Sequence, residues 1–176
     1  TCGGNGQARC AGVCDPGTRY DSNTYKCVSC GQDGQPYCLD GADRSSGNRT
    51  CNEGTRLDSN TYKCVACGGA GQTYCLTDPS NTWGDRECNA GTRFDSNTYK
   101  CVPCGNAGQT YCLTDPLNTS GDRRCNAGTR LDSNTYQCVA CGGNGQTYCF
   151  DDANNTSGNR VCAPGLHVNG NYLCVP

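Results

Sequence analysis

The chain has 176 residues with fourteen basic and sixteen acidic side chains, and Leu, Val and Phe together make up only 18 residues, with no Ile or Met. So few large aliphatic side chains cannot build an ordinary packed core, and this composition would normally predict a disordered chain. The near-neutral charge, without long runs of one sign, makes nucleic acid and anionic membranes poor candidates as partners.

The cysteine content reverses the prediction of disorder. Twenty of the residues are Cys, which indicates a scaffold in which disulfides replace apolar burial. Such bonds persist in an oxidising compartment, so we expect an extracellular or cell-surface protein. No apolar run approaches the roughly 18 residues of a membrane span. Because neither a signal peptide nor an initiating Met is present, we expect a mature, processed product.

The cysteines recur in five units of four, denoted a, b, c and d in chain order. Successive units start 28 residues apart at first and 37 residues apart thereafter, which is typical of a tandem array. The predicted repeats are 1–28, 29–65, 66–102, 103–139 and 140–176. Their cysteines are Cys2, Cys10, Cys14 and Cys27; Cys30, Cys38, Cys51 and Cys64; Cys67, Cys75, Cys88 and Cys101; Cys104, Cys112, Cys125 and Cys138; and Cys141, Cys149, Cys162 and Cys174.

Loop lengths within a repeat bear on which cysteines pair. Seven residues separate a from b in every repeat, and twelve separate c from d in all but the last, which has eleven. The b-to-c segment has three residues in the first repeat and twelve in the others. Two loops of constant length joined by a variable one favour a–b and c–d disulfides, with b-to-c as a surface excursion. A crossed scheme, d with the next b and a with c, is the alternative.

The c-to-d loop predicts a β-hairpin. Turn-forming residues 58–61 separate Leu57 from Tyr62, and the last repeat has Asn169-Gly170 at the same tip. We expect the flanking pair to form a miniature core in each repeat. Tyr37, Tyr74, Tyr111 and Tyr148, just before cysteine b, should add a second apolar contact. With no helical pattern, the expected fold is small, disulfide-rich and mostly loop with short hairpins, in an elongated array of five repeats.

The polar b-to-c segments contain the N-glycosylation acceptor pattern at Asn48, Asn118, Asn154 and Asn155. All four fall in the segment expected to be exposed, so we predict covalent glycans there if the source is eukaryotic. Asn154 and Asn155 are adjacent and are not expected to be used together. The single tryptophan, Trp83, is interpreted as a local apolar contact rather than an exposed binding anchor.

Metal and catalytic sites are not expected. The Cys-x-x-Cys spacing of pairs such as Cys27 and Cys30 also suits zinc, but these pairs fall at repeat junctions, where structural disulfides are the better interpretation. His167 is the only histidine and takes a slot that elsewhere holds Arg, which excludes a repeated His-dependent site. The aspartates after cysteine b could bind calcium through their oxygens, but a role in loop turns is the better interpretation; they are Asp40, Asp78, Asp115 and Asp151.

The c-to-d loop, Cys-x-x-Gly-Thr followed by a polar loop and Cys-x-x-Cys, resembles the Cys-rich repeats of tumour necrosis factor receptors and of ephrin-receptor-like and growth-factor-receptor-like modules. The match covers about 17 residues of each repeat, and the phrase between a and b does not fit the receptor pattern. The resemblance implies an elongated extracellular protein without enzymatic activity, and it supports the bridges Cys51–Cys64, Cys88–Cys101 and Cys125–Cys138.

Near-identical repeats without a distinctive site favour a structural protein, a subunit of a filament or surface coat. Thr1 and Pro176 stand at the same position of the repeat, so a second molecule could continue the array, and we expect head-to-tail homopolymers. A receptor-like rod that binds a protein or glycan ligand is the alternative.

Overall fold

The computed structural model describes residues 1–78, 84–115 and 120–176. Its described residues form short strands that pair into two-stranded antiparallel sheets, joined by turns and bends, and contain no helix. None of them therefore belongs to a helix that could cross a membrane. This is the disulfide-rich, loop-rich hairpin array that the sequence predicts.

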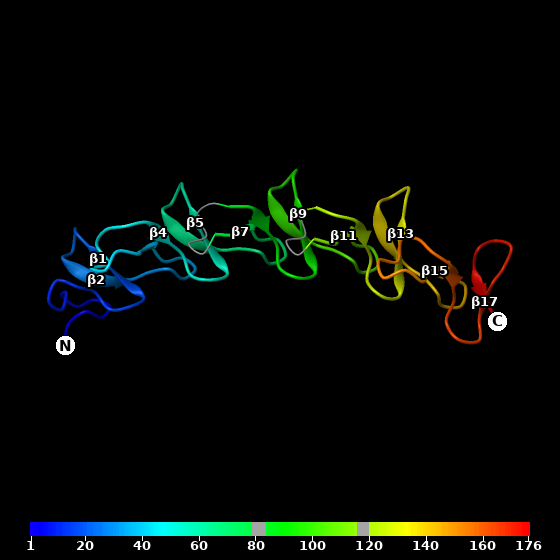
Figure 1. Ribbon diagram of the computed structural model, residues 1–176, viewed down its shortest axis with the longest axis horizontal. Coiled ribbons are helices and arrows are strands. Elements are labelled where there is room, and N and C mark those ends of the chain that lie inside the picture. The colour runs from blue at the N-terminus through cyan, green and yellow to red at the C-terminus, as the bar shows by residue number, and fades with distance from the viewer. Residues whose placement is uncertain (79–83, 116–119) are drawn as a thin grey trace. The chain divides into compact units, whose positions relative to one another are not determined.

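The c-to-d loop of every repeat is a hairpin, as predicted (Figure 1). In the first four repeats both strands have four residues, whereas the fifth hairpin is shorter. The strand pairs are β1 (Thr18–Asp21) with β2 (Lys26–Ser29), β5 (Thr55–Asp58) with β6 (Lys63–Ala66), β9 (Thr92–Asp95) with β10 (Lys100–Pro103), β13 (Thr129–Asp132) with β14 (Gln137–Ala140), and β17 (His167–Val168) with β18 (Cys174–Val175).

The b-to-c segment carries a second, smaller ladder that the sequence did not indicate. Two residues at cysteine b pair with the two residues before cysteine c, so the arginine there is held beside the a-to-b ring. The pairs are β3 (Cys38–Leu39) with β4 (Arg49–Thr50), β7 (Cys75–Leu76) with β8 (Arg86–Glu87), β11 (Cys112–Leu113) with β12 (Arg123–Arg124), and β15 (Cys149–Phe150) with β16 (Arg160–Val161).

The hairpin turn is organised by an aspartate. In the second repeat the Asp58 carboxylate accepts hydrogen bonds from the Asn60 backbone N–H at 3.0 Å and the Thr61 hydroxyl at 2.7 Å. Tyr62 then takes a left-handed backbone with φ of 56°, and its N–H donates to the Asp58 carbonyl. Leu57 consequently faces Cys64, not Tyr62. In the second repeat the predicted apolar pair is therefore not opposed across the ladder, because the tyrosine lies in the turn rather than in the strand. In the third repeat the predicted pair is in contact, since the Phe94 and Tyr99 rings meet edge to face with their centres 6.1 Å apart.

The last hairpin keeps this turn in a shorter form. Asn169 replaces the aspartate, and its side-chain carbonyl accepts hydrogen bonds from the N–H groups of Asn171 and Leu173, both at 3.0 Å. Tyr172 again has a positive φ, of 63°. The Asn169 N–H donates to the Leu173 carbonyl and closes the loop. The tip is thus not a two-residue Asn-Gly turn, although the hairpin itself is present.

The disulfides join a to b and c to d in every repeat, which is the scheme that the loop lengths favoured. The bridges are Cys2–Cys10, Cys14–Cys27, Cys30–Cys38, Cys51–Cys64, Cys67–Cys75, Cys88–Cys101, Cys104–Cys112, Cys125–Cys138, Cys141–Cys149 and Cys162–Cys174. Every buried apolar side chain in the described parts of the chain is a cysteine. The core is therefore a series of disulfides.

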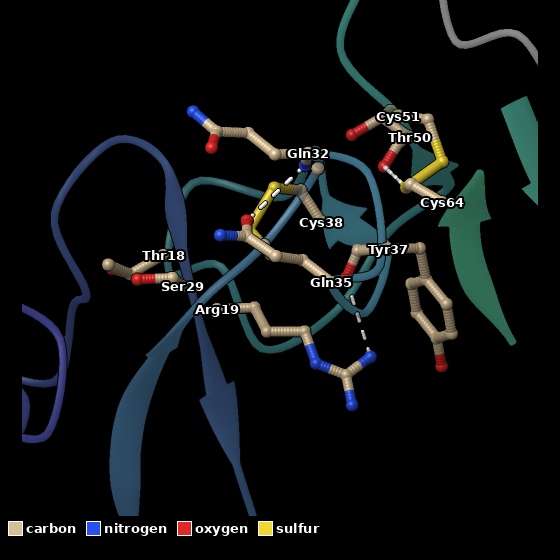
Figure 2. The surroundings of a disulfide bond; sticks show 12 residues. Thr18, Arg19, Ser29, Gln32, Gln35, Tyr37, Cys38, Thr50, Cys51 and Cys64 are labelled. Atoms are coloured by element: carbon tan, nitrogen blue, oxygen red, sulfur yellow. Dashed lines mark hydrogen bonds between the residues drawn. A yellow bond between two sulfur atoms is a disulfide. The ribbon is translucent and has the colours of Figure 1, made fainter. Parts of the chain in front are cut away.

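In the first, second, fourth and fifth repeats the hairpin is tied to the a-to-b ring of its own repeat by backbone hydrogen bonds. In the second repeat the buried Thr55 hydroxyl lies 2.9 Å from the Gly31 carbonyl, and the Cys64 backbone exchanges hydrogen bonds with Gly34 and Gln35, both at 2.8 Å. Figure 2 shows Cys38, which is bridged to Cys30, and the Cys51–Cys64 disulfide. In the second repeat, disulfides, a threonine hydroxyl and backbone hydrogen bonds thus hold the hairpin against the ring.

The joint between successive repeats uses the glycine that precedes this threonine. The N–H of each cysteine a donates at 3.0 Å to a glycine carbonyl of the preceding hairpin; the acceptors are Gly17, Gly54, Gly91 and Gly128. These glycines have φ between 75° and 79°, a left-handed conformation that L side chains rarely adopt. The chain divides into two compact units, Thr1–Glu87 and Cys88–Pro176, with a boundary inside the predicted repeat 66–102.

Candidate functional site

Arginine and tyrosine side chains stack at each repeat, and we call each group an arginine–tyrosine stack. A stack contains an arginine from the preceding hairpin, the tyrosine before cysteine b, the arginine before cysteine c, and the tyrosine of the hairpin turn. Within the two compact units these are Arg19–Tyr37–Arg49–Tyr62, Arg93–Tyr111–Arg123–Tyr136 and Arg130–Tyr148–Arg160–Tyr172, together with the partial stack Arg56–Tyr74–Arg86.

The first arginine crosses from one repeat to the next. Arg19 leaves strand β1, and its guanidinium carbon lies 4.4 Å from the centre of the Tyr37 ring. One of its terminal nitrogens also donates to the Tyr37 carbonyl at 3.5 Å (Figure 2). Its Nε is buried without a hydrogen-bond acceptor in the structure. The negative face of the aromatic ring therefore compensates the charge of this half-buried side chain.

The second arginine lies between two rings. The guanidinium carbon of Arg49 is 4.9 Å from the ring centres of both Tyr37 and Tyr62. Pairing of β3 with β4 places Arg49 opposite Leu39, beside the a-to-b ring. The two-residue ladder thus positions the cation that links this ring to the hairpin of the same repeat.

The stacked cations change the acidity of the inner tyrosines. A hydrogen bond from Arg56 lowers the pKa of the Tyr74 phenol, and its positive charge adds to the effect. Arg93 and Arg130 lower the pKa values of Tyr111 and Tyr148 in the same way. The same shift thus recurs at Tyr74, Tyr111 and Tyr148.

The outer tyrosines form the accessible side of the stacks. Their exposed fractions range from 49% to 73%, and they are Tyr25, Tyr62, Tyr99, Tyr136 and Tyr172. Each presents a ring at a hairpin corner with a left-handed backbone. In three stacks an arginine lies on that ring at 4.5 to 4.9 Å. The surface can offer aromatic contact and guanidinium hydrogen bonds to a partner.

Sequence reasoning missed these stacks. It identified the inner tyrosines only as apolar contacts, and it used the hairpin arginines only to exclude histidine chemistry. The available signal was the recurrence of Arg in Gly-Thr-Arg and in the residues before cysteine c. The end repeats depart from the pattern: Arg9 lies 3.9 Å from the Tyr20 ring in the first, and the exposed His167 replaces the hairpin arginine in the fifth.

The aspartates weighed for calcium serve the b-to-c loops instead. Asp40 accepts hydrogen bonds from the backbone and side chain of Asn48, at 2.7 and 3.1 Å, and Asp151 does the same with Asn159. Asp115 accepts from the Ser120 N–H at 2.6 Å, while Asp78 is buried. In residues 1–78, 84–115 and 120–176 no three potential metal-ligating side chains are grouped together.

The predicted glycosylation sites differ in their surroundings. Asn48 is exposed, whereas Asn154 and Asn155 are half-buried. Asn118 and Trp83 lie outside the described residues. No protein-family model and no curated protein matches the chain. The geometry thus shows a Cys-rich repeat with paired disulfides and small hairpins, and its most regular feature is the arginine–tyrosine stack.

Proposed function

We propose that this chain is an extracellular structural repeat protein, a subunit of a filament or surface coat that assembles head to tail. The observation that carries the proposal is the sameness of the joints. Within the two compact units the four cysteine-to-glycine hydrogen bonds all measure 3.0 Å. The hairpin arginines of the first four repeats lie 4.3 to 4.7 Å from the next inner tyrosine.

Identical joints suit a protein whose task is length and stiffness. An array in which each repeat contacts its neighbours gains stability by nearest-neighbour interfaces, and further repeats extend it. The contact between repeats is also heterologous, because the hairpin of one repeat contacts the a-to-b ring of the next. Such a contact between two molecules would propagate rather than close. The proposal assigns the protein no catalytic role and no cofactor.

The disulfides support the proposed compartment. Ten bridges, with no free cysteine in the described residues, would not persist in a reducing cytosol. Extracellular location and N-linked glycans on the b-to-c segments therefore belong to the same proposal. The resemblance of the c-to-d loop to tumour necrosis factor receptor and related repeats supports the same location, because those repeats are extracellular.

Electron microscopy of concentrated protein tests the assembly. Filaments or sheets are the expected result, and deletion of residues 1–28 should abolish them. The matched control deletes residues 66–102, one whole internal repeat, which leaves the junction Cys64-Val65-Pro103-Cys104 in the usual Cys-Val-x-Cys form. This control should still assemble, with a shorter axial period. Monodisperse monomers at all concentrations, or assembly that survives loss of the first repeat, would contradict the proposal.

A receptor-like role is the second candidate, and the b-to-c loops favour it. Their sequences differ between repeats, although Arg44 and Asn155 share a left-handed backbone, with φ of 56° and 55°, and their carbonyls accept hydrogen bonds from the preceding hairpins. Receptors vary such loops to distinguish ligands. Specific, saturable binding of the monomer to one extracellular protein or glycan, lost when a single b-to-c loop is replaced by another, would favour this role over the structural one.

A further inference from the structure

A polar groove of about 510 Å³ lies inside the second compact unit. It is formed where the residues before cysteine c of the fourth repeat meet strand β13 and the b-to-c loop of the fifth repeat. Arg123 and Leu131 line one part, and Asp152, Asn154 and Thr156 line another. Its volume is in the range of about 300–1,000 Å³ that small ligands occupy in proteins.

Two overlapping glycosylation patterns adjoin this groove, and the structure separates them. Asn155 has a left-handed backbone, and its side-chain oxygen accepts a hydrogen bond from the Phe150 N–H at 3.1 Å. Its own N–H donates to the Asp152 carbonyl at 3.1 Å, and its carbonyl accepts from the Leu131 N–H at 3.4 Å. This side chain is held against the backbone of its own loop.

Asn154 has the opposite arrangement. Its backbone is fixed, because its N–H donates to the Asp152 carboxylate at 3.1 Å and its carbonyl accepts from the Cys125 N–H at 2.9 Å. Its side chain makes no hydrogen bond within the described part of the chain and lines the groove. The amide nitrogen that would carry a sugar is therefore free on a rigid support.

We propose that Asn154, and not Asn155, is the N-glycosylated residue of this pair, and that the first N-acetylglucosamine lies in the groove. Leu131 would contact the apolar part of the sugar, and the Arg123 guanidinium would donate hydrogen bonds to its oxygens. The groove suits this occupant because it combines one aliphatic side chain with several polar groups next to the attachment point. The inference rests on the proposed extracellular location, and not on filament assembly.

The modification uses the lipid diphosphate-linked oligosaccharide of a eukaryotic secretory pathway. A bond forms between Nδ2 of Asn154 and the anomeric carbon of the sugar, and the bond from that carbon to the diphosphate oxygen breaks. The lipid diphosphate leaves with the electron pair, and Nδ2 loses one proton. Asn154 keeps its carbonyl and one N–H, while its backbone hydrogen bonds are unaffected.

Two alanine variants one residue apart test the assignment. In a background that lacks the other two patterns through Thr50→Ala and Ser120→Ala, Thr156→Ala removes the pattern of Asn154 but leaves Asn155-Ala-Ser157. Ser157→Ala does the reverse and leaves Asn154-Asn-Thr156. After secretion from eukaryotic cells, intact mass should show one glycan on the Ser157→Ala protein and none on the Thr156→Ala protein. The opposite result, or bare chains in both, overturns the proposal.

Enzymatic release of the glycan tests its place in the groove. With the Asn48 pattern retained, an endoglycosidase that cleaves the chitobiose core should release the exposed Asn48 glycan several-fold faster than the Asn154 glycan. Arg123→Ala should reduce the difference between the two release rates, and reduction of the disulfides should abolish that difference. Equal rates in the folded protein would show that the sugar does not occupy the groove. The measurement of glycan occupancy by mass does not depend on assembly. The glycosylation proposal can therefore fail while the filament proposal stands, and the reverse.

Discussion

The guanidinium carbon of Arg93 lies 4.3 Å from the centre of the Tyr111 ring, and one of its nitrogens donates to the Tyr111 carbonyl at 3.5 Å. These residues are 18 positions apart and belong to different repeats. Because apolar contacts are scarce in this chain, such a pair carries an unusual share of the energy that fixes one repeat on the next.

Arg93→Ala should therefore destabilise the second compact unit. Cation–π contacts of partly desolvated arginines contribute about 1 to 2 kcal/mol, so a loss of this size is expected in urea unfolding of the oxidised protein. Arg124→Ala is the control, because Arg124 is exposed and has no ring contact with any described residue; it should change stability by less than about 0.5 kcal/mol. Equal effects would contradict the role of the stack. Tyr111→Phe should retain most of the stability, since the ring remains.

The phenol of Tyr111 should lose its proton at a lower pH than an ordinary tyrosine. Because Arg93 lowers the pKa of Tyr111, its phenol should lose its proton below the ordinary value of about 10. The depressed pKa means that ionised Tyr111 stabilises the fold above that ordinary value, and the contribution is lost as the pH falls through the folded-state pKa. Site-resolved NMR of labelled tyrosine measures this titration. Arg93→Gln should return the Tyr111 midpoint toward the ordinary value, whereas Arg124→Gln should leave it unchanged.

Acid should affect the hairpin turns of the first four repeats but not that of the fifth. A hydrogen bond from the Thr61 hydroxyl, and one from the Asn60 N–H, lower the pKa of Asp58; Asp21, Asp95 and Asp132 are shifted in the same direction. A depressed carboxyl pKa stabilises the turn above its unfolded value of about 3.9, and this contribution is lost as the pH falls through the folded pKa.

The fifth turn provides an internal control for this prediction. Asn169 accepts the same kind of hydrogen bond with an amide that does not titrate. In an acid titration followed by NMR, the amide proton of Asn60 should shift in a single transition below about pH 4, while that of Asn171 stays constant. A parallel shift at Asn171 would show that the acid effect is not a property of the aspartate turns.

Reduction should unfold the chain. Each bridge contributes about 3 kcal/mol in the chain-entropy model for loops of this size, and no apolar core in the described residues replaces it. Loss of amide-proton dispersion on adding a thiol is the expected signal. A non-reducing peptide map should contain Cys51–Cys64 and Cys67–Cys75. A bridge between Cys64 and Cys75 would establish the crossed scheme.

Small-angle scattering of the monomer tests the array. A compact chain of 176 residues would have a radius of gyration of about 16 Å, and a linear series of repeats should exceed this clearly. Removal of residues 66–102 should shorten the particle by one repeat and lower its maximum dimension accordingly. A value near the compact one for the full chain would exclude an elongated array.

The constant spacing of the paired cysteines favoured the observed rings over the crossed scheme, and the turn residues 58–61 were enough to predict the hairpin. These patterns were not enough to place Tyr62. The position of Tyr62 depends on Asp58. The Asp58 carboxylate accepts hydrogen bonds from the residues that follow it and stabilises a turn, so Tyr62 lies in the turn and not in the strand. The alternation of apolar and polar residues expected for a strand does not reveal this competition between side-chain hydrogen bonds and strand pairing of the backbone.

The stacks could not be predicted for a different reason. Arg49 reaches its two tyrosines only because Leu39 and Arg49 pair across the b-to-c segment. No strand pattern is present in the sequence at residues 38, 39, 49 and 50, and the polar segment between them is typical of a loop. Contacts between segments of successive repeats arise from tertiary geometry, so a local sequence pattern does not reveal them.

A core made of sulfur also sets how the protein responds to temperature. Unfolding an ordinary domain exposes much apolar surface to water, which raises the heat capacity by about 12–15 cal/mol/K per residue and curves the stability strongly. Here the buried apolar side chains of the described residues are cysteines that stay bridged in the unfolded chain. The heat-capacity increment per residue should therefore be small, and the free energy of unfolding should vary little between cold and warm surroundings.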